Sequence, residues 1–171
     1  MLDMFQGAAE AVGTCVKRFT TIGDAVSYVQ GLAGGDPISA SHLTPEIREA
    51  FRGTVFAAPG EYADTRLCVS SARAGIAATG SILLELTDPK ERGATALPLI
   101  QALFLKASTI VADLYALQKL IAEGLTSSGN AYLSLTTGPS RTADIERVLT
   151  IGVHGPSRLV IVFVDDLGRN E

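Results

Sequence analysis

The sequence of 171 residues contains no tryptophan, and only 6% of its residues are aromatic. Single-stranded nucleic acids are usually held on aromatic stacking platforms, which this composition does not favour. The chain also lacks an excess of positive charge, because its formal net charge is −4 and its lysines and arginines are dispersed. A phosphate backbone attracts clustered cations, so we expect no nucleic-acid partner.

Long apolar runs are also missing. No run approaches the roughly 20 residues that a membrane-spanning helix needs. The N-terminal sequence MLDMFQGAAE carries acids instead of the basic head of a signal peptide. We therefore expect a cytoplasmic protein without a membrane span.

Cysteine is scarce, since the chain has Cys15, Cys68 and no other cysteine. Each is flanked by aliphatic residues, and cytosolic thiols are kept reduced, so buried free thiols are favoured over a disulfide. Two isolated cysteines do not supply the usual four ligands of an iron–sulfur cluster or a structural zinc. We expect this chain to bind no metal or cofactor itself, and any iron–sulfur cluster of its system to lie on a partner protein.

The sequence does contain enough apolar material for one core. Its hydrophobic fraction is 47% and its charged fraction 19%, which is typical of globular proteins. The length suits one domain, and no internal repeat is visible. We expect a single domain over residues 1–171.

Periodicity in the first half of the chain predicts alternating helices and strands. Helices are expected over 4–12 and 22–31, and a third from Thr44 to about Gly53, where Thr44 can cap the helix and Pro45 suits its first position. Strands are expected at 16–20, 67–69 and 81–86. Between the last two, residues 72–80 are small and allow a close backbone approach.

The second half continues the alternation. Residues 89–93 read as a charged turn, 97–105 as a buried strand, 110–121 as the longest amphipathic helix and 131–135 as a strand. A helix over 145–149 and a central strand over 159–164 follow. Strands that alternate with helices predict an α/β fold, with a mainly parallel sheet flanked by helices.

The segment 136–146 is the most informative for function, because it follows a predicted strand and opens a predicted helix. Helix N-termini hold carboxylates or phosphates through free amides, and Ser140 and Thr142 add hydroxyl donors. A cation such as Arg141 is disfavoured there by about 0.3–1 kcal/mol, a cost that a bound anion would offset. The structural alternative is an ion pair of Arg141 with Asp144 or Glu146.

Other polar residues allow both functional and structural interpretations. His154, in a turn over 152–156, can act as an acid or base near neutral pH, although a lone histidine is more often structural. Thr79 and Ser81 offer hydroxyls beside Gly80, or form a tight turn. His42, before a helix cap, is interpreted as structural. No phosphate-binding loop or nucleophile elbow occurs, which disfavours nucleotide hydrolysis.

Two parts of the sequence resemble a known family. The segment 75–81 (GIAATGS), and the segment 137–146 (TGPSRTADIE) with 152–156 (GVHGP), resemble the LUD domain of LutC/YkgG-type lactate-utilisation proteins, the lactate-utilisation protein C family. The resemblance spans about Leu67 to Asp166. It implies a fold similar to the NagB/RpiA/CoA-transferase-like group, in which loop glycines and hydroxyls bind phosphate or acyl substrates. It also implies a role in oxidation of L-lactate to pyruvate beside two partners that carry iron–sulfur clusters.

The chain departs from the family pattern in two ways. Ala78 stands where the family often has an acid before the Thr-Gly pair, so a general base at that position would be lost. The chain is also short at its N-terminus, where longer relatives carry a cap or docking segment.

We therefore expect an accessory component of L-lactate oxidation that binds a small anionic ligand or iron–sulfur partner proteins. Its expected ligand-binding residues are Thr79, Gly80, Ser81, Gly138, Ser140, Arg141 and Thr142. The alternative is a stand-alone enzyme or a sensor that acts on a phosphorylated or acyl (CoA-type) small molecule, with His154 or Asp144 as the candidate catalytic residue. The sequence leaves open whether the chain catalyses a reaction.

Overall fold

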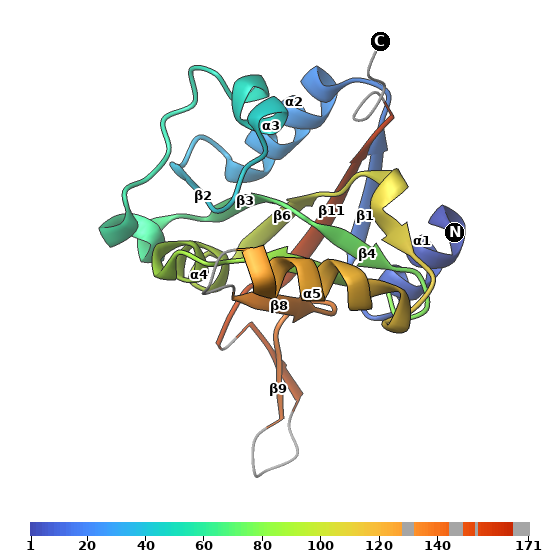
Figure 1. The fold of residues 1–171 in the computed structure, drawn as a ribbon. Coiled ribbons are helices and arrows are strands. Elements are labelled where there is room, and N and C mark those ends of the chain that lie inside the picture. The colour runs from blue at the N-terminus through green and yellow to red at the C-terminus, as the bar shows by residue number, and fades with distance from the viewer. Residues whose placement is uncertain (128–131, 144–148, 153, 166–171) are drawn as a thin grey trace.

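The computed structural model describes residues 1–127, 132–143, 149–152 and 154–165, in which two sheets pack between helices (Figure 1). The helices are α1 (Leu2–Ala11), α2 (Ile22–Ala33), α3 (Pro45–Ala50), α4 (Pro89–Ala96) and α5 (Gln118–Ser127). The strands are β1 (Cys15–Phe19), β2 (Ile38–Ala40), β3 (Leu67–Ser71), β4 (Ala74–Ile76), β5 (Ser81–Glu85), β6 (Ile100–Phe104), β7 (Ile110–Val111), β8 (Leu133–Thr136), β9 (Arg141–Ala143), β10 (Leu149–Ile151) and β11 (Arg158–Val164). Short 3-10 helices lie at Pro59–Asp64, Ala107–Thr109 and Tyr115–Leu117.

The larger sheet has five parallel strands in the order β1-β11-β6-β3-β2. Strand β11 pairs with β1 on one side and β6 on the other. The prediction that its apolar run lies centrally is confirmed. The predicted fold class, an α/β protein with a mainly parallel sheet flanked by helices, is confirmed as well.

Each face of this parallel sheet builds its own core, because alternate side chains of a strand point to opposite faces. Val160 and Val162 of β11 pack with residues of α2 and α3. Leu159 and Ile161 point the other way and pack with Phe5 of α1 and with strand β5. Full burial of a side chain of this size contributes about 1.5–3 kcal/mol.

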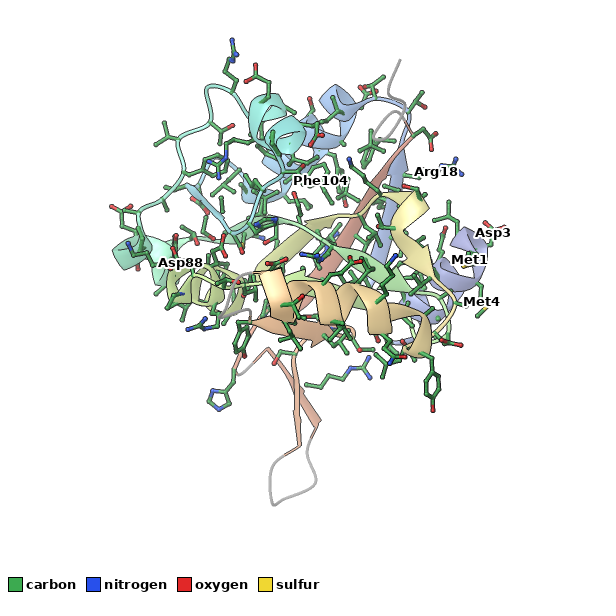
Figure 2. All side chains as sticks on the ribbon, viewed as in Figure 1. Met1, Asp3, Met4, Arg18, Asp88 and Phe104 are labelled. Atoms are coloured by element: carbon green, nitrogen blue, oxygen red, sulfur yellow. The ribbon has the colours of Figure 1, made fainter. Side chains whose placement is uncertain are left out.

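The first core is closed by aromatic rings beneath α3. Phe104, at the end of β6, points toward this helix (Figure 2). Its ring meets that of Phe51 edge to face with the ring centroids 5.9 Å apart, within the range of about 4.5–7 Å that is typical of aromatic pairs. Phe51 follows α3 directly, so the predicted helix from Thr44 is confirmed but ends at Ala50.

A second sheet covers the other face of the parallel sheet. Its four strands run in the order β7-β4-β5-β8, with β5 antiparallel to both neighbours. Helix α5 packs on its outer face, where Leu120 and Ile121 meet Ile76 and Leu83. The layers are therefore α2 with α3, the parallel sheet, the second sheet, and α5 (Figure 1). The sequence did not predict this second sheet.

Two elements expected between residues 89 and 121 differ in the structure. The helix expected over 110–121 begins only at Gln118, because Ile110 and Val111 pair with β4 as strand β7. The turn expected at 89–93 is the start of α4. Asp88 caps this helix by accepting a 2.9 Å hydrogen bond from the Lys90 amide, so the Asp-Pro pair is a helix start like the Thr-Pro pair of α3.

The two cysteines are both free. Cys68 is buried in β3, as expected, whereas Cys15 is half-buried. Burial raises the pKa of the Cys68 thiol to about 11, so it stays protonated and unreactive at neutral pH.

None of the described helices is both long enough and apolar enough to cross a bilayer.

Helix α1 is found where its apolar spacing predicted it. Its Phe5 and Ala9 pack into the core between the parallel sheet and the second sheet. The last turn of α1 packs against the backbone of two glycines. Gly80 has a φ of +65°, and a Cβ there would lie 2.3 Å from the Ala9 amide nitrogen. Gly138 has a φ of +71°, and its Cβ would lie 2.7 Å from the Val12 carbonyl oxygen. Both positions need glycine for their left-handed backbone and for the close approach of α1.

The substitution Gly80→Ala tests this packing, with Gly34→Ala as the matched control. Gly34 has a φ of +66°, but a Cβ there would meet nothing within 4 Å. Both variants lose about 1–2 kcal/mol to the left-handed backbone. We expect Gly80→Ala to lose about 1–3 kcal/mol more, because α1 must move. Urea unfolding measures both losses, and equal losses would contradict the close packing of α1.

Candidate functional site

The Thr79-Gly80-Ser81 motif is joined to the end of β8 by a chain of hydroxyl groups. Thr79 Oγ1 lies 2.7 Å from Ser81 Oγ, which lies 2.6 Å from Thr137 Oγ1. Ser81 is buried, and the other two are exposed. These hydroxyls satisfy one another and tie the turn before β5 to residue 137, while Gly80 receives α1. The structure therefore accounts for this motif by packing, and its predicted ligand-binding role stays a prediction.

The segment 136–146 does not open a helix at residues 141–143. The helix predicted over 145–149 falls on residues outside those that the structure describes, apart from Leu149, which begins strand β10. Residues 141–143 form strand β9, which pairs antiparallel with β10 in a hairpin that projects from the second sheet (Figure 1). The base of the hairpin is held by the Ser140 amide, which donates to the Pro156 carbonyl at 2.9 Å, and by the Gly152 amide, which donates to the Ser140 carbonyl at 2.9 Å. Residues 144–148 lie outside the described residues.

Arg141 consequently does not lie at a helix N-terminus. Its Nη2 donates a 2.6 Å hydrogen bond to the carbonyl oxygen of Val12, just beyond the C-terminal end of α1. A cation is favourable at that end of a helix, where free carbonyls carry partial negative charge. The electrostatic cost that the sequence analysis assigned to Arg141 therefore does not arise. Its hydrogen bond to Val12 instead helps to hold α1 in place. Asp144 and Glu146, the expected alternative partners, lie outside the described residues.

A groove of about 440 Å³ lies beside this contact, between the second sheet and the first residues of β6 and β11. Leu84 of β5 and Leu159 of β11 form part of its apolar side. Its polar side includes Thr95, Gln101, Ser134, Thr136, Arg141 and His154. The part of the lining that the structure describes contains no aspartate or glutamate. The groove therefore favours an uncharged or anionic ligand.

Gln101 is the most unusual residue of the groove. Gln101 lies in β6 on the same face as Leu103. The whole residue is only 3% exposed to solvent. Its Nε2 has no hydrogen-bond partner among the described residues. A buried donor without a partner costs about 1–3 kcal/mol, and a ligand oxygen in the groove would remove that cost. The sequence signal was available, because Gln101 is the one amide within the apolar run 97–105.

The groove brings together several of the residues predicted from sequence to form a functional site. The expected ligand-binding residues Gly138, Ser140 and Arg141 line it, and so does the candidate catalytic residue His154. The Ser140 hydroxyl donates to the His154 carbonyl at 3.2 Å, so it positions the loop that carries the histidine. Thr79, Gly80 and Ser81 are not part of the lining.

Two further candidates are not placed at this groove. Thr142 belongs to strand β9, and the structure does not describe its side chain. Asp144 lies outside the described residues. Of the two candidate catalytic residues, only His154 is therefore placed at the groove. His154 is exposed to solvent.

Comparison with curated proteins finds similarity to lactate-utilisation proteins. Lactate utilization protein C of Bacillus pumilus is 34% identical over 95 residues, which cover 53% of this chain and 39% of that protein. The Escherichia coli protein YkgG is 28% identical over 133 residues, which cover 77% of this chain and 51% of that protein. The chain thus matches about two fifths to half of the length of these relatives.

A solved structure and a family model extend the comparison. The crystal structure of a DUF162 family protein from Deinococcus radiodurans aligns with a TM-score of 0.66 and 16% identity over 95% of each chain, which supports the fold alone. The LUD domain family model matches residues 42–164. This match includes the groove, the hairpin and the glycine turns that receive α1. The chain belongs to the LUD domain family.

Proposed function

We propose that the chain is a non-redox component of lactate utilisation that binds a small hydroxycarboxylate, such as L-lactate, in the groove beside Gln101. The names of the relatives supply the process, because several are lactate utilization C proteins. The groove supplies the ligand chemistry. The single observation that carries the proposal is the buried Gln101 amide, whose Nε2 lacks a partner among the described residues.

The polar lining suits an anion with hydroxyl or carbonyl oxygens. Gln101 would donate to a ligand oxygen, and hydroxyls such as those of Ser134 and Thr136 can donate or accept. Leu84 and Leu159 offer an apolar surface for a methyl group. A ligand of this kind would be held by several weak contacts on both its polar and its apolar side.

Arg141 supplies positive charge at the groove. Its bond to Val12 uses one of the guanidinium's five N–H groups, and the described lining has no carboxylate to neutralise it. The anchored guanidinium is held in place before a ligand arrives, which lowers the entropic cost of binding. We propose that Arg141 attracts the carboxylate, as inferred from the sequence, although it does so from a strand instead of a helix N-terminus.

The proposed role needs no redox chemistry in this chain. Oxidation of lactate to pyruvate removes two electrons, and we propose that iron–sulfur proteins of the same system accept them. This chain would bind the substrate or product and dock those partners. His154 would contact the ligand from the loop that Ser140 positions.

The variants Gln101→Leu and Arg141→Ala test the ligand site by calorimetric titration with L-lactate. We expect Gln101→Leu to bind roughly tenfold more weakly, because one neutral hydrogen bond contributes about 0.5–1.5 kcal/mol. Its unfolding free energy should equal or exceed that of the wild type, because an unpartnered buried amide is replaced by an apolar group. We expect Arg141→Ala to bind at least tenfold more weakly, since hydrogen bonds to charged groups contribute about 1.5–3 kcal/mol.

The control is Arg52→Ala, which removes one positive charge from an exposed pair with Glu49, neither of which lines the groove. This variant should bind L-lactate like the wild type. A wild-type protein that does not bind L-lactate, or a Gln101→Leu variant that binds it unchanged, would contradict the proposed site.

Partner binding is tested by an anaerobic pull-down of the tagged chain from its native cells grown on lactate. We expect co-purifying iron–sulfur proteins and a brown eluate, since this chain is proposed to dock cluster-bearing partners. Untagged cells are the control for retention on the resin. A colourless eluate that contains the chain alone would contradict the accessory role and favour the stand-alone enzyme or sensor.

A further inference from the structure

A second cavity, of about 230 Å³, lies at the opposite end of β6 from Gln101. The segments that follow three adjacent parallel strands converge on it, with His42 after β2, Arg73 after β3 and Lys106 after β6. In open α/β sheets, ligands bind in the crevice outside the carboxyl ends of the strands. The sequence interpretation treated His42 as structural and did not single out Arg73 or Lys106 as site residues.

We propose that this cavity is a binding site for a compact oxyanion, a small carboxylate or inorganic phosphate. The proposal does not depend on the function proposed for the groove. The two cavities share no lining residue, so each can fail without the other.

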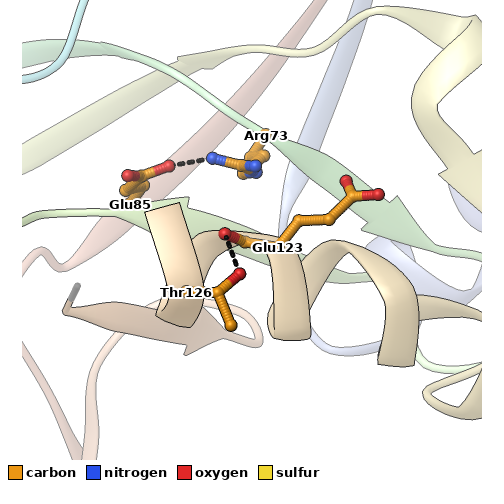
Figure 3. A network of polar contacts seen from close by, with 4 residues as sticks. All are labelled: Arg73, Glu85, Glu123 and Thr126. Carbon is orange, nitrogen blue, oxygen red and sulfur yellow. Dashed lines mark hydrogen bonds and ion pairs between the residues drawn. The ribbon is translucent and has the colours of Figure 1, made fainter. Parts of the chain in front are cut away.

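The charges of the cavity favour an anion. Arg73 and Lys106 line it together with one carboxylate, that of Glu85. Arg73 forms an ion pair with Glu85 (Figure 3). The two side chains are only 32% and 23% exposed. This pair holds the guanidinium in place while leaving further N–H groups for a ligand. The charge of Lys106 remains in excess within the lining.

Lys106 is available to a ligand. Its Nζ lies 3.9 Å from Glu46 Oε1, which is beyond hydrogen-bond distance. The pKa of Glu46 is lowered first by its own backbone N–H, next by the Thr44 hydroxyl, and only then by the charge of Lys106. Glu46 is therefore stabilised mainly by other groups, and the Lys106 ammonium can donate to an anion in the cavity.

A buried hydroxyl adds a further donor. Ser71, at the end of β3, is 4% exposed, and its Oγ accepts a 2.9 Å hydrogen bond from the Thr44 amide. This bond fixes the oxygen and leaves the hydroxyl proton for another acceptor. No acceptor for that proton is found in the described part of the chain. An anion oxygen in the cavity can take it.

The size and the remaining walls limit the ligand. The volume of about 230 Å³ is below the roughly 300–1,000 Å³ of pockets for drug-sized molecules. Ile47 and Phe104 form an apolar wall. The cavity thus fits an anion of few atoms, and its apolar side can accept a short aliphatic group.

The experiment uses the full chain, with inorganic phosphate and acetate as separate probes and sodium chloride at matched ionic strength as the blank. The test variant is Lys106→Gln. The control is Lys119→Gln on α5, because Lys119 Nζ also lies 3.9 Å from a glutamate oxygen, that of Glu123, but on the exposed surface. Thermal unfolding and calorimetric titration are measured for each protein and probe.

We expect the wild type and Lys119→Gln to be stabilised by at least one probe beyond the chloride blank, and Lys106→Gln to bind that probe at least tenfold more weakly. Response to phosphate alone would identify a phosphate site, and response to acetate a carboxylate site. Ser71→Ala should also weaken binding and replaces Lys106→Gln as the test if that variant does not fold. The proposal is overturned if neither probe exceeds chloride, or if the test variant binds like Lys119→Gln.

Discussion

The last turn of α1 lies against backbone that only glycine allows, and the position of the groove depends on this contact. Gly80 and Gly138 bring the turn before β5 and the end of β8 against residues 9–12, and the Arg141 guanidinium closes the contact on the Val12 carbonyl. The chain of hydroxyls through Ser81 joins the same two segments. Together these contacts hold one wall of the groove against the parallel sheet. Residues that the sequence analysis predicted to bind a ligand, such as Gly80 and Gly138, thus help to position the second sheet.

Strand β6 connects the two candidate sites of the molecule. Gln101 near its start faces the groove between the sheets, and Lys106 after its end faces the cavity at the carboxyl edge. The core between them is closed by buried residues such as Leu103. The groove has no carboxylate in its described lining, whereas the cavity contains the Arg73–Glu85 pair. This difference in charge and size favours different ligands at the two ends of one strand.

Local patterns in the sequence were sufficient to predict many of the helices and strands of the fold. The apolar run of β11 and helix α2, which begins at Ile22, are both found where they were expected. The environment of Arg141 could not be predicted locally, because its partner Val12 is 129 residues away in sequence. His42 and Lys106 line the same cavity only because the strands that precede them lie in one parallel sheet. Gln101 was visible as an amide in an apolar run, but its missing partner appears only in three dimensions. The relation of the fold to the NagB/RpiA/CoA-transferase-like group stays a prediction.

The most direct test of the central claim, that Gln101 binds the ligand of the groove, is a titration with L-lactate followed by ¹H–¹⁵N NMR of the side-chain amides. The spectrum of Gln101→Leu assigns the Gln101 signals. Gln30 is the internal control, because its Nε2 already donates to Thr54 Oγ1 at 3.0 Å. We predict a saturable shift of the Gln101 amide signals with little change at Gln30. Gln101 signals that stay in place throughout the titration would contradict the account.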